Sequence, residues 1–262
     1  MQRFIYYLRV WWLMSKNSFL MVLAQRLGMV IFLMGKLLRF GFFIFFLIFL
    51  VKGTGTLAGY SLNQTVFFFL TFNLIDVLAQ FLFREVYRFR PQVVSGSFDL
   101  ILTKPVNALF RSLMGGVDFI DFITIPPLLV AIYWVGKALD PSSFQVMLYI
   151  LLLANALIIA TAFHIAVISL GIITLEIDHA IMIYRDLVAL GRFPIDIYRE
   201  PLRGVLTYFV PVAIMISLPS RALMGIATPT GVLISFIIGA VALFAALRFW
   251  NFALKYYTSA SS

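Results

Sequence analysis

The sequence predicts an all-α membrane protein with about six transmembrane helices, an N-terminal helix in the membrane interface and a short cytoplasmic helix. Hydrophobic residues make up 63% of the 262 residues and charged residues only 12%. A soluble domain carries about 25% charged residues and about half apolar ones, so the composition excludes an ordinary soluble enzyme or a disordered chain. The apolar residues also gather in runs of about 20, enough to cross about 30 Å of hydrocarbon.

Cysteine and histidine usage excludes several kinds of chemistry. The chain has no Cys, so it forms no disulfide and no thiolate metal site. Its two His residues, His164 and His179, leave little for a zinc site. The net charge of +9 is more typical of cytoplasmic loops that face anionic lipid headgroups than of nucleic-acid binding. We therefore expect membrane lipids as partners, and no metal, catalytic residue or nucleic acid on this chain.

Residues 1–28 are expected to form a helix that lies in the membrane interface. Phe4, Tyr7, Trp11 and Met14 follow helical spacing and make an apolar stripe, and tryptophan suits the headgroup layer. The helix would serve as a plain anchor, which the sequence favours, or as a lever between a cytoplasmic partner and the first span.

Five apolar segments are expected to span the membrane. The first carries Lys36 and Arg39 near its start, and both side chains can extend towards the headgroups. The fourth is so long that it must be tilted or extend beyond the bilayer. In chain order the segments are Met29–Val51, Tyr60–Phe83, Val117–Val135, Phe144–Leu175 and Gly231–Trp250.

Residues 176–224 allow two interpretations. In one, Glu176–Leu190 is part of a polar fifth span and Phe193–Met224 forms short re-entrant helices on the far side. In the other, Glu176–Arg203 stays in the cytoplasm and Gly204–Met224 is the fifth span, which the arginines of this region favour. Both interpretations give about six spans and place the two termini on the same side.

The distribution of Lys and Arg sets the predicted orientation. The amino end, the loop after the second span and the carboxyl tail are rich in these residues. The loops opposite them carry only Lys52, and Lys137 beside Asp140. By the positive-inside rule, both termini are expected in the cytoplasm.

Two predicted spans carry polar residues on one helical face. Asn73, Asp76 and Gln80 lie at i, i+3 and i+7 of the second span, and Asp118 and Asp121 begin the third. Ionisable groups at membrane depth normally face protein or water. The residues are therefore candidates for a transport path or subunit contact, or for hydrogen bonds that hold the bundle. For Asp118 and Asp121, a position at headgroup level fits better than a proton relay.

A further polar cluster, Glu176, Asp178 and His179, follows the fourth span. Glu176 and His179 are within reach of one metal ion, but no third ligand is in register. We therefore expect cap or turn residues there. His164, within the apolar fourth span, is expected to be a buried hydrogen-bonding residue.

The loop of residues 84–105 is the candidate cytoplasmic docking element. Between Gly96 and Pro105, the segment Ser97–Lys104 has the length for two helical turns. An exposed apolar knob with a basic rim needs a partner or the membrane surface to cover it, and the residues alone favour neither. The knob consists of Phe98, Ile101 and Leu102, and its rim of Arg88, Arg90 and Lys104.

Two runs of the sequence resemble the ABC-2 type permeases. Val93–Leu113 (VVSGSFDLILTKPVNALFRSL) is similar to the segment after the second span of that family, where a small residue, an acid, an apolar stretch and a proline recur. Arg192–Gly225 resembles the late region of the same family. The most similar subgroup is the bacterial permeases encoded beside a second permease and an ATPase. The resemblance covers nearly the whole chain.

This resemblance implies a single transmembrane domain over residues 1–262, in the bacterial inner membrane, with residues 191–226 as a re-entrant region outside. The chain would be one permease of an ATP-binding cassette transporter that exports a lipid-like, amphipathic or drug-like substrate. It would bind no cofactor, because ATP and magnesium belong to a partner ATPase, and a second permease chain, identical or homologous, would complete the path. The coupling helix would contact the ATPase through Phe98, Asp99, Leu102, Lys104 and Pro105.

Two other functions are alternatives. An ion-coupled carrier that uses Asp76, Glu176 and His179 would transport without an ATPase, but the sequence shows no inverted repeat to support it. An intramembrane enzyme of lipid metabolism needs a clustered acid–base or metal set, which the sequence also lacks. There is no phosphate-binding loop, so we do not expect this chain to hydrolyse ATP itself.

Overall fold

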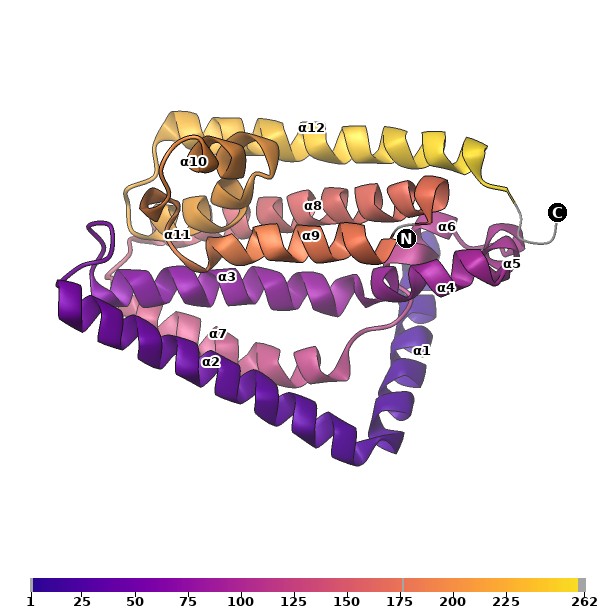
Figure 1. The fold of residues 1–262 in the computed structure, drawn as a ribbon, viewed down its shortest axis with the longest axis horizontal. Coiled ribbons are helices and arrows are strands. Elements are labelled where there is room, and N and C mark those ends of the chain that lie inside the picture. Colours follow the sequence, from indigo (N-terminus) through magenta and orange to yellow (C-terminus); the bar gives the residue numbers. More distant parts are fainter. Residues whose placement is uncertain (1, 176, 259–262) are drawn as a thin grey trace.

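The computed structural model describes residues 2–175 and 177–258. Over these residues the chain is almost entirely helical, as predicted, and its only β-type pairing is an isolated bridge between Leu57 and Tyr60. Five of the described helices are long and apolar enough to cross a membrane. They run along the long axis of the molecule, α2 obliquely (Figure 1). They are α2 (Arg26–Thr54), α3 (Leu62–Leu82), α7 (Phe119–Lys137), α8 (Ser143–Thr174) and α12 (Pro229–Ala253).

Each of these five helices agrees with a predicted span to within three residues at either end. Capping boxes fix where two of them begin: Ser61 and Gln64 exchange hydrogen bonds at the start of α3, and Ser142 and Gln145 do so at the start of α8. With 32 residues, α8 is about 48 Å long. It therefore extends beyond a bilayer core of about 30 Å, as the sequence predicts.

Helix α8 is the centre of the bundle, and α12 packs along it. The two helices approach closely where Gly239 meets Asn155, since a Cβ at residue 239 would lie 2.1 Å from Asn155 Oδ1. The Asn155 side chain donates to Ser235 O at 2.9 Å and to Ser235 Oγ at 2.7 Å. A small residue and an interhelical hydrogen bond are the usual means of joining helices in lipid.

Helix α1 (Gln2–Ala24) lies across one end of the bundle (Figure 1). The Tyr7 ring packs 4.8 Å from the ring of Phe110, and Trp11 packs 6.3 Å from Phe81. The predicted apolar stripe thus covers the bundle at Tyr7 and Trp11, whereas Phe4 is 68% exposed. The crossing direction is the one expected of an interfacial helix.

Four short helices lie at the same end of the bundle as α1. They connect α3 to α7, and both described ends of the chain meet them: Tyr7 contacts Asn107, and the ring of Tyr257 packs 5.1 Å from that of Phe98. These helices are η1 (Arg84–Arg88), α4 (Phe89–Val94), α5 (Ser97–Thr103) and α6 (Ala108–Leu113).

Helix α9 (Ile177–Ala189) runs back along α8 towards the opposite end of the bundle, which we call the outer end (Figure 1). The chain then forms a series of short helices, which begins beside the middle of α3 and continues to the outer end, before α12 leads back. Residues 202–209 and 213–223 form a pair bent by 76°. Because the chain reaches the outer end before residue 202 and α12 leaves from it, the bent pair begins and ends at this end, which favours the re-entrant interpretation. The series comprises η2 (Leu190–Arg192), η3 (Ile195–Ile197), α10 (Leu202–Gly204), η4 (Val205–Phe209), η5 (Ala213–Ser217) and α11 (Leu218–Leu223).

The structure decides between the two interpretations of residues 176–224. Tyr60, in the loop between α2 and α3 at the outer end, donates from its hydroxyl to Asp196 Oδ2 at 2.9 Å. Asp196 therefore lies far from α5, and the interpretation that keeps Glu176–Arg203 on the α5 side is wrong. The number of arginines in this region gives the wrong side for Arg203, because its charge is neutralised by an ion pair with Asp196.

Candidate functional site

Helix α5 follows Gly96, whose φ of 74° suits glycine. The helix turns the side chains of Phe98 and Ile101 towards the bundle. Phe98 is fully buried. Its ring packs 5.1 Å from Phe89 and 6.4 Å from Trp250, at the carboxyl end of α12. The expectation that Phe98 belongs to an exposed docking knob is therefore corrected: its ring attaches α5 to α4 and α12.

The outward side of this region is apolar at its centre. Leu100 is 63% exposed, Leu102 41% and Val94 56%, and Lys104 beside them is also exposed. We call these four residues the α5 surface. The sequence pattern indicates an exposed stripe through Phe98 and Ile101, but these two residues are buried. Leu100, which that pattern does not select, is exposed instead.

The predicted docking residues thus divide between two sides. Leu102, Lys104 and Pro105 are exposed, Asp99 is half-buried and Phe98 faces inward. The segment directly after α5 is bound to α1, because the Tyr6 hydroxyl donates to Pro105 O at 3.4 Å and Asn107 N donates to the Tyr7 hydroxyl at 3.2 Å. A displacement of α5 would therefore act on both α1 and α12.

The acids at the start of α7 are structural ion-pair partners. Asp118 caps the helix by accepting from Ile120 N at 2.8 Å, and Arg84 Nε lies 3.3 Å from its carboxylate. Asp121 is buried and pairs with Lys36 of α2. The lysine supplies the counter-charge that permits burial of Asp121, and a position of this pair at headgroup level stays a prediction.

The polar face of α3 is half-buried along its length. Asn73 donates to Phe69 O of its own helix at 2.7 Å. Asp76 and Gln80 line a narrow crevice between α3, α8 and α9, together with Tyr87 and Arg185. The structure thus joins the predicted α3 residues to α9, a neighbour that spacing along one helix does not reveal.

Arg185 lines this crevice, and its charge and that of Arg39 both act on Arg192. We call Arg39, Arg185 and Arg192 the arginine face. The Arg192 guanidinium lies 5.5 Å from the ring centre of Phe72, and Arg185 lies 5.8 Å from that of Tyr87. Arg192 is close enough to Arg39 and Arg185 to be repelled by their charges. Within residues 2–175 and 177–258, none of the three has an ion pair within 4 Å.

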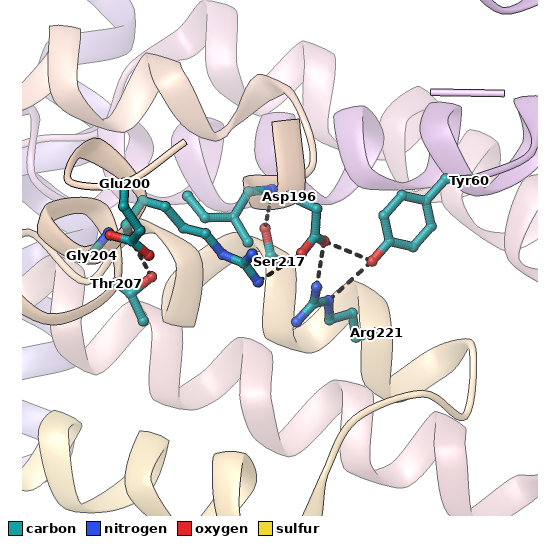
Figure 2. Close-up of polar contacts among 9 residues, drawn as sticks. Tyr60, Asp196, Glu200, Gly204, Thr207, Ser217 and Arg221 are labelled. Carbon is teal, nitrogen blue, oxygen red and sulfur yellow. Dashed lines mark hydrogen bonds and ion pairs between the residues drawn. The ribbon is translucent and has the colours of Figure 1, made fainter. Parts of the chain in front are cut away.

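At the outer end, a second set of charges forms a closed network around Asp196, as Figure 2 shows. Tyr60 and Arg221 both bind Oδ2 of Asp196. Arg203 Nη2 donates to Oδ1 at 3.0 Å, and Arg221 Nε donates to the Tyr60 hydroxyl at 3.2 Å. Ile195 N also donates to Ser217 Oγ at 3.3 Å. The network, here called the Asp196 network, joins the α2–α3 loop to η3, α10 and α11.

The electrostatics of Asp196 follow from these partners. Burial alone would raise the pKa of its carboxyl group, but hydrogen bonds from Arg221 and Tyr60 and the charges of Arg221 and Arg203 outweigh that cost. The pKa of Asp196 therefore lies below its ordinary value. The acid is ionised at neutral pH and serves as a structural anchor.

The structure describes only two members of the cluster after α8, Asp178 and His179. Glu176 lies outside the described residues, and Asp178 forms an exposed pair with Arg90 at 3.6 Å. Among the residues that the structure describes, no three metal-ligating side chains gather. His164 is fully buried with Nδ1 2.7 Å from Ala160 O, the hydrogen-bonding role expected for it. His179 lies exposed in the first turn of α9.

Comparisons with known proteins gave one match. A family model described as ABC-2 family transporter protein matches residues 37–261. Comparisons with curated proteins and with solved structures found no match. The matched residues include α5, the arginine face and the Asp196 network.

Proposed function

The chain belongs to the ABC-2 family of transporter proteins, and on that premise we propose that it is the permease subunit of an ATP-binding cassette exporter driven by a separate ATPase. ATP and magnesium would be bound by that ATPase. A second permease chain, identical or homologous, would complete the transport path in the bacterial inner membrane. The substrate would be lipid-like, amphipathic or drug-like.

The observation that carries this proposal is the α5 surface. A seven-residue helix exposes two leucines at the end of a membrane bundle, where a soluble subunit can cover them. Its inward face is fixed to the bundle by Phe98. A helix that is rigidly attached on one side and apolar on the other is suited to transmit force from a docked subunit.

The proposed mechanism needs no chemistry on this chain. Movement of the ATPase would displace α5, and Phe98 would pass the displacement to the end of α12 through Trp250. Hydrogen bonds at Pro105 and Asn107 would pass it to α1. The ATPase would bind the two arrangements of the bundle with different affinities, which is what shifts a conformational equilibrium. In this mechanism α1 acts as a lever as well as an anchor.

Charge distribution supports the proposed orientation. The loop after α3, at the α5 end, carries Arg84, Arg88, Arg90 and Lys104, whereas the loop between α2 and α3 carries no Lys or Arg beyond Lys52 at the end of α2. An excess of Lys and Arg marks cytoplasmic segments. We therefore place α5 and both termini in the cytoplasm.

The test is a matched pair of charge insertions in the complete complex. Leu102→Glu places a carboxylate in the α5 surface and is expected to reduce copurification of the ATPase and ATP-driven transport about tenfold or more, as for a central interface residue. Ile226→Glu, at an exposed outer position (50%, against 41% for Leu102), should leave both unchanged. Intact coupled transport in Leu102→Glu would contradict the docking assignment. Uphill transport by the permease without any ATPase would instead support an ion-coupled carrier.

A further inference from the structure

The arginine face has a charge imbalance at membrane depth. Arg39 lies near the middle of the 29-residue helix α2, and Arg192 lies beside Phe72, at the middle of α3. The acids whose charges reach Arg192 are Asp76 and Asp186. Neither acid forms an ion pair within 4 Å among the described residues. Asp76 lines the same crevice as Arg185, so three guanidinium groups share two carboxylates and one positive charge is left over.

Elsewhere in the bundle, basic side chains have carboxylate partners within the same chain. Lys36 pairs with Asp121, Arg84 with Asp118, and Arg111 with Glu85 at 2.8 Å. An uncompensated arginine at membrane depth is costly unless it faces water or a counter-charge. The arginine face is thus a place where the chain lacks a negative group that it supplies elsewhere.

Aromatic rings adjoin these guanidinium groups. Arg192 lies 6.0 Å from the centre of Phe43 and 5.5 Å from that of Phe72, and Phe43 stacks on Phe69 at 4.5 Å. The side chain of Arg185 is exposed over Tyr87. Guanidinium binds carboxylate, sulfonate or phosphate oxygens in a fixed two-pronged geometry. Phe69 and Phe72 are buried, so the apolar surface beside Arg192 is the half-buried ring of Phe43.

From this combination we propose that the arginine face binds the anionic head of an amphipathic substrate, whose apolar body lies against the half-buried ring of Phe43. This inference rests on the proposed function, since it names the substrate class for that transport path. A zwitterionic or cationic amphiphile lacks the net negative charge that the three arginines require. Arg192 is the main residue of the proposed site, because it lies against the rings of Phe43 and Phe72 and is repelled by the charges of both other arginines.

The experiment compares two probes that differ in charge only. Dansylaminoundecanoate and its methyl ester share the same aromatic group and apolar chain, and binding of each to the purified permease–ATPase complex is followed by dansyl fluorescence in a neutral detergent. We expect the carboxylate to bind about tenfold more tightly than the ester, the effect of about one charge-assisted hydrogen-bond pair. Equal affinity for the two probes would overturn the inference.

Variants then locate the binding site. Arg192→Gln and Arg185→Gln should abolish the preference for the carboxylate, and Arg192→Lys should retain part of it because the charge remains. Arg199→Gln, an exposed arginine at the outer end, should leave the preference intact and is the matched control. A preference that survives Arg192→Gln would overturn the assignment to the arginine face.

Two further readouts separate the possible failures. If Arg192→Gln splits the complex into its permease chains, as measured by its mass in detergent, the arginines pair with the second permease and the inference is overturned. Copurification of the ATPase is measured in parallel. If no ATPase copurifies but the isolated permease still prefers the carboxylate, the proposed function is wrong and the anion site remains. If the ATPase is bound but the preference for the carboxylate is absent, only the anion site is wrong.

Discussion

The Asp196 network and the arginine face use the same side-chain types in opposite ways. Around Asp196, one carboxylate receives Tyr60, Arg203 and Arg221, and every charge lies within hydrogen-bonding distance of its counterpart (Figure 2). On the arginine face, guanidinium groups meet aromatic rings and one another, with no carboxylate within 4 Å in the described part of the chain. The charges of the Asp196 network are compensated within one chain, whereas the arginine face would need a negative group from outside the chain.

The comparison also separates structural from functional charge. The Asp196 network joins three short helices between residues 195 and 223 to the α2–α3 loop, so its charges stabilise a part of the fold that lacks a long helix. Residues on the arginine face form no ion pair within 4 Å among the described residues, so their charges contribute little to holding α2, α9 and η2 together. Removing a charge should therefore have unequal consequences for stability in the two regions.

The largest effect is expected for Asp196→Asn. The substitution keeps the shape of the side chain but leaves the half-buried Arg221 guanidinium, 28% exposed, without its carboxylate. Hydrogen bonds to charged groups contribute about 1.5–3 kcal/mol each, so we expect the free energy of unfolding to fall by about 2–3 kcal/mol. Thermal unfolding of the purified protein in detergent measures the change.

Asp140→Asn is the control for that experiment. Asp140 is exposed in the loop between α7 and α8, at the same end of the bundle, and its φ of 49° is one that asparagine adopts readily. Its substitution should leave the unfolding temperature unchanged. Equal losses in the two variants would mean that the Asp196 network contributes nothing specific.

Lowering the pH should reduce the stability of the wild-type protein gradually, and by less than the substitution does. Because the pKa of Asp196 is lower in the folded protein than in the unfolded chain, its contribution is complete above the unfolded value of about 4. The contribution is lost as the pH falls from there through the folded pKa. Unfolding temperatures of wild type and Asp196→Asn should therefore converge below about pH 4. A constant difference down to pH 3 would contradict the linkage.

Sequence alone predicts the long elements well, because each span is defined by a local property. Apolar runs located α2, α3, α7, α8 and α12 to within three residues, and no knowledge of neighbours was needed. Family resemblance added the ABC-2 assignment, which the family match confirms. The direction in which Phe98 points was wrong because it depends on Trp250 and Tyr257, more than 150 residues away in the chain.

The charged clusters fall outside sequence prediction for the same reason. Counting arginines by position treats Arg192 and Arg203 alike, as cytoplasmic markers. Their different roles appear only when folding brings Asp196 to Arg203 and leaves Arg192 beside Phe72. An aspartate flanked by prolines and arginines in a short-helix region, as in the run from Pro194 to Pro201, is a signal that would justify suspecting such a network.

The smallest effect on stability is expected for Arg192→Gln, and it is the sharpest test of the contrast. No ion pair is lost, and repulsion from Arg39 and Arg185 is relieved. The cation–π contacts with Phe43 and Phe72 contribute about 0.5–1 kcal/mol each at exposed sites. These opposing contributions should leave the free energy of unfolding within about 0.5 kcal/mol of wild type, measured as for Asp196→Asn. A loss as large as that of Asp196→Asn would show that Arg192 has a structural partner after all, and the arginine face would then resemble the Asp196 network instead of a site awaiting an anion.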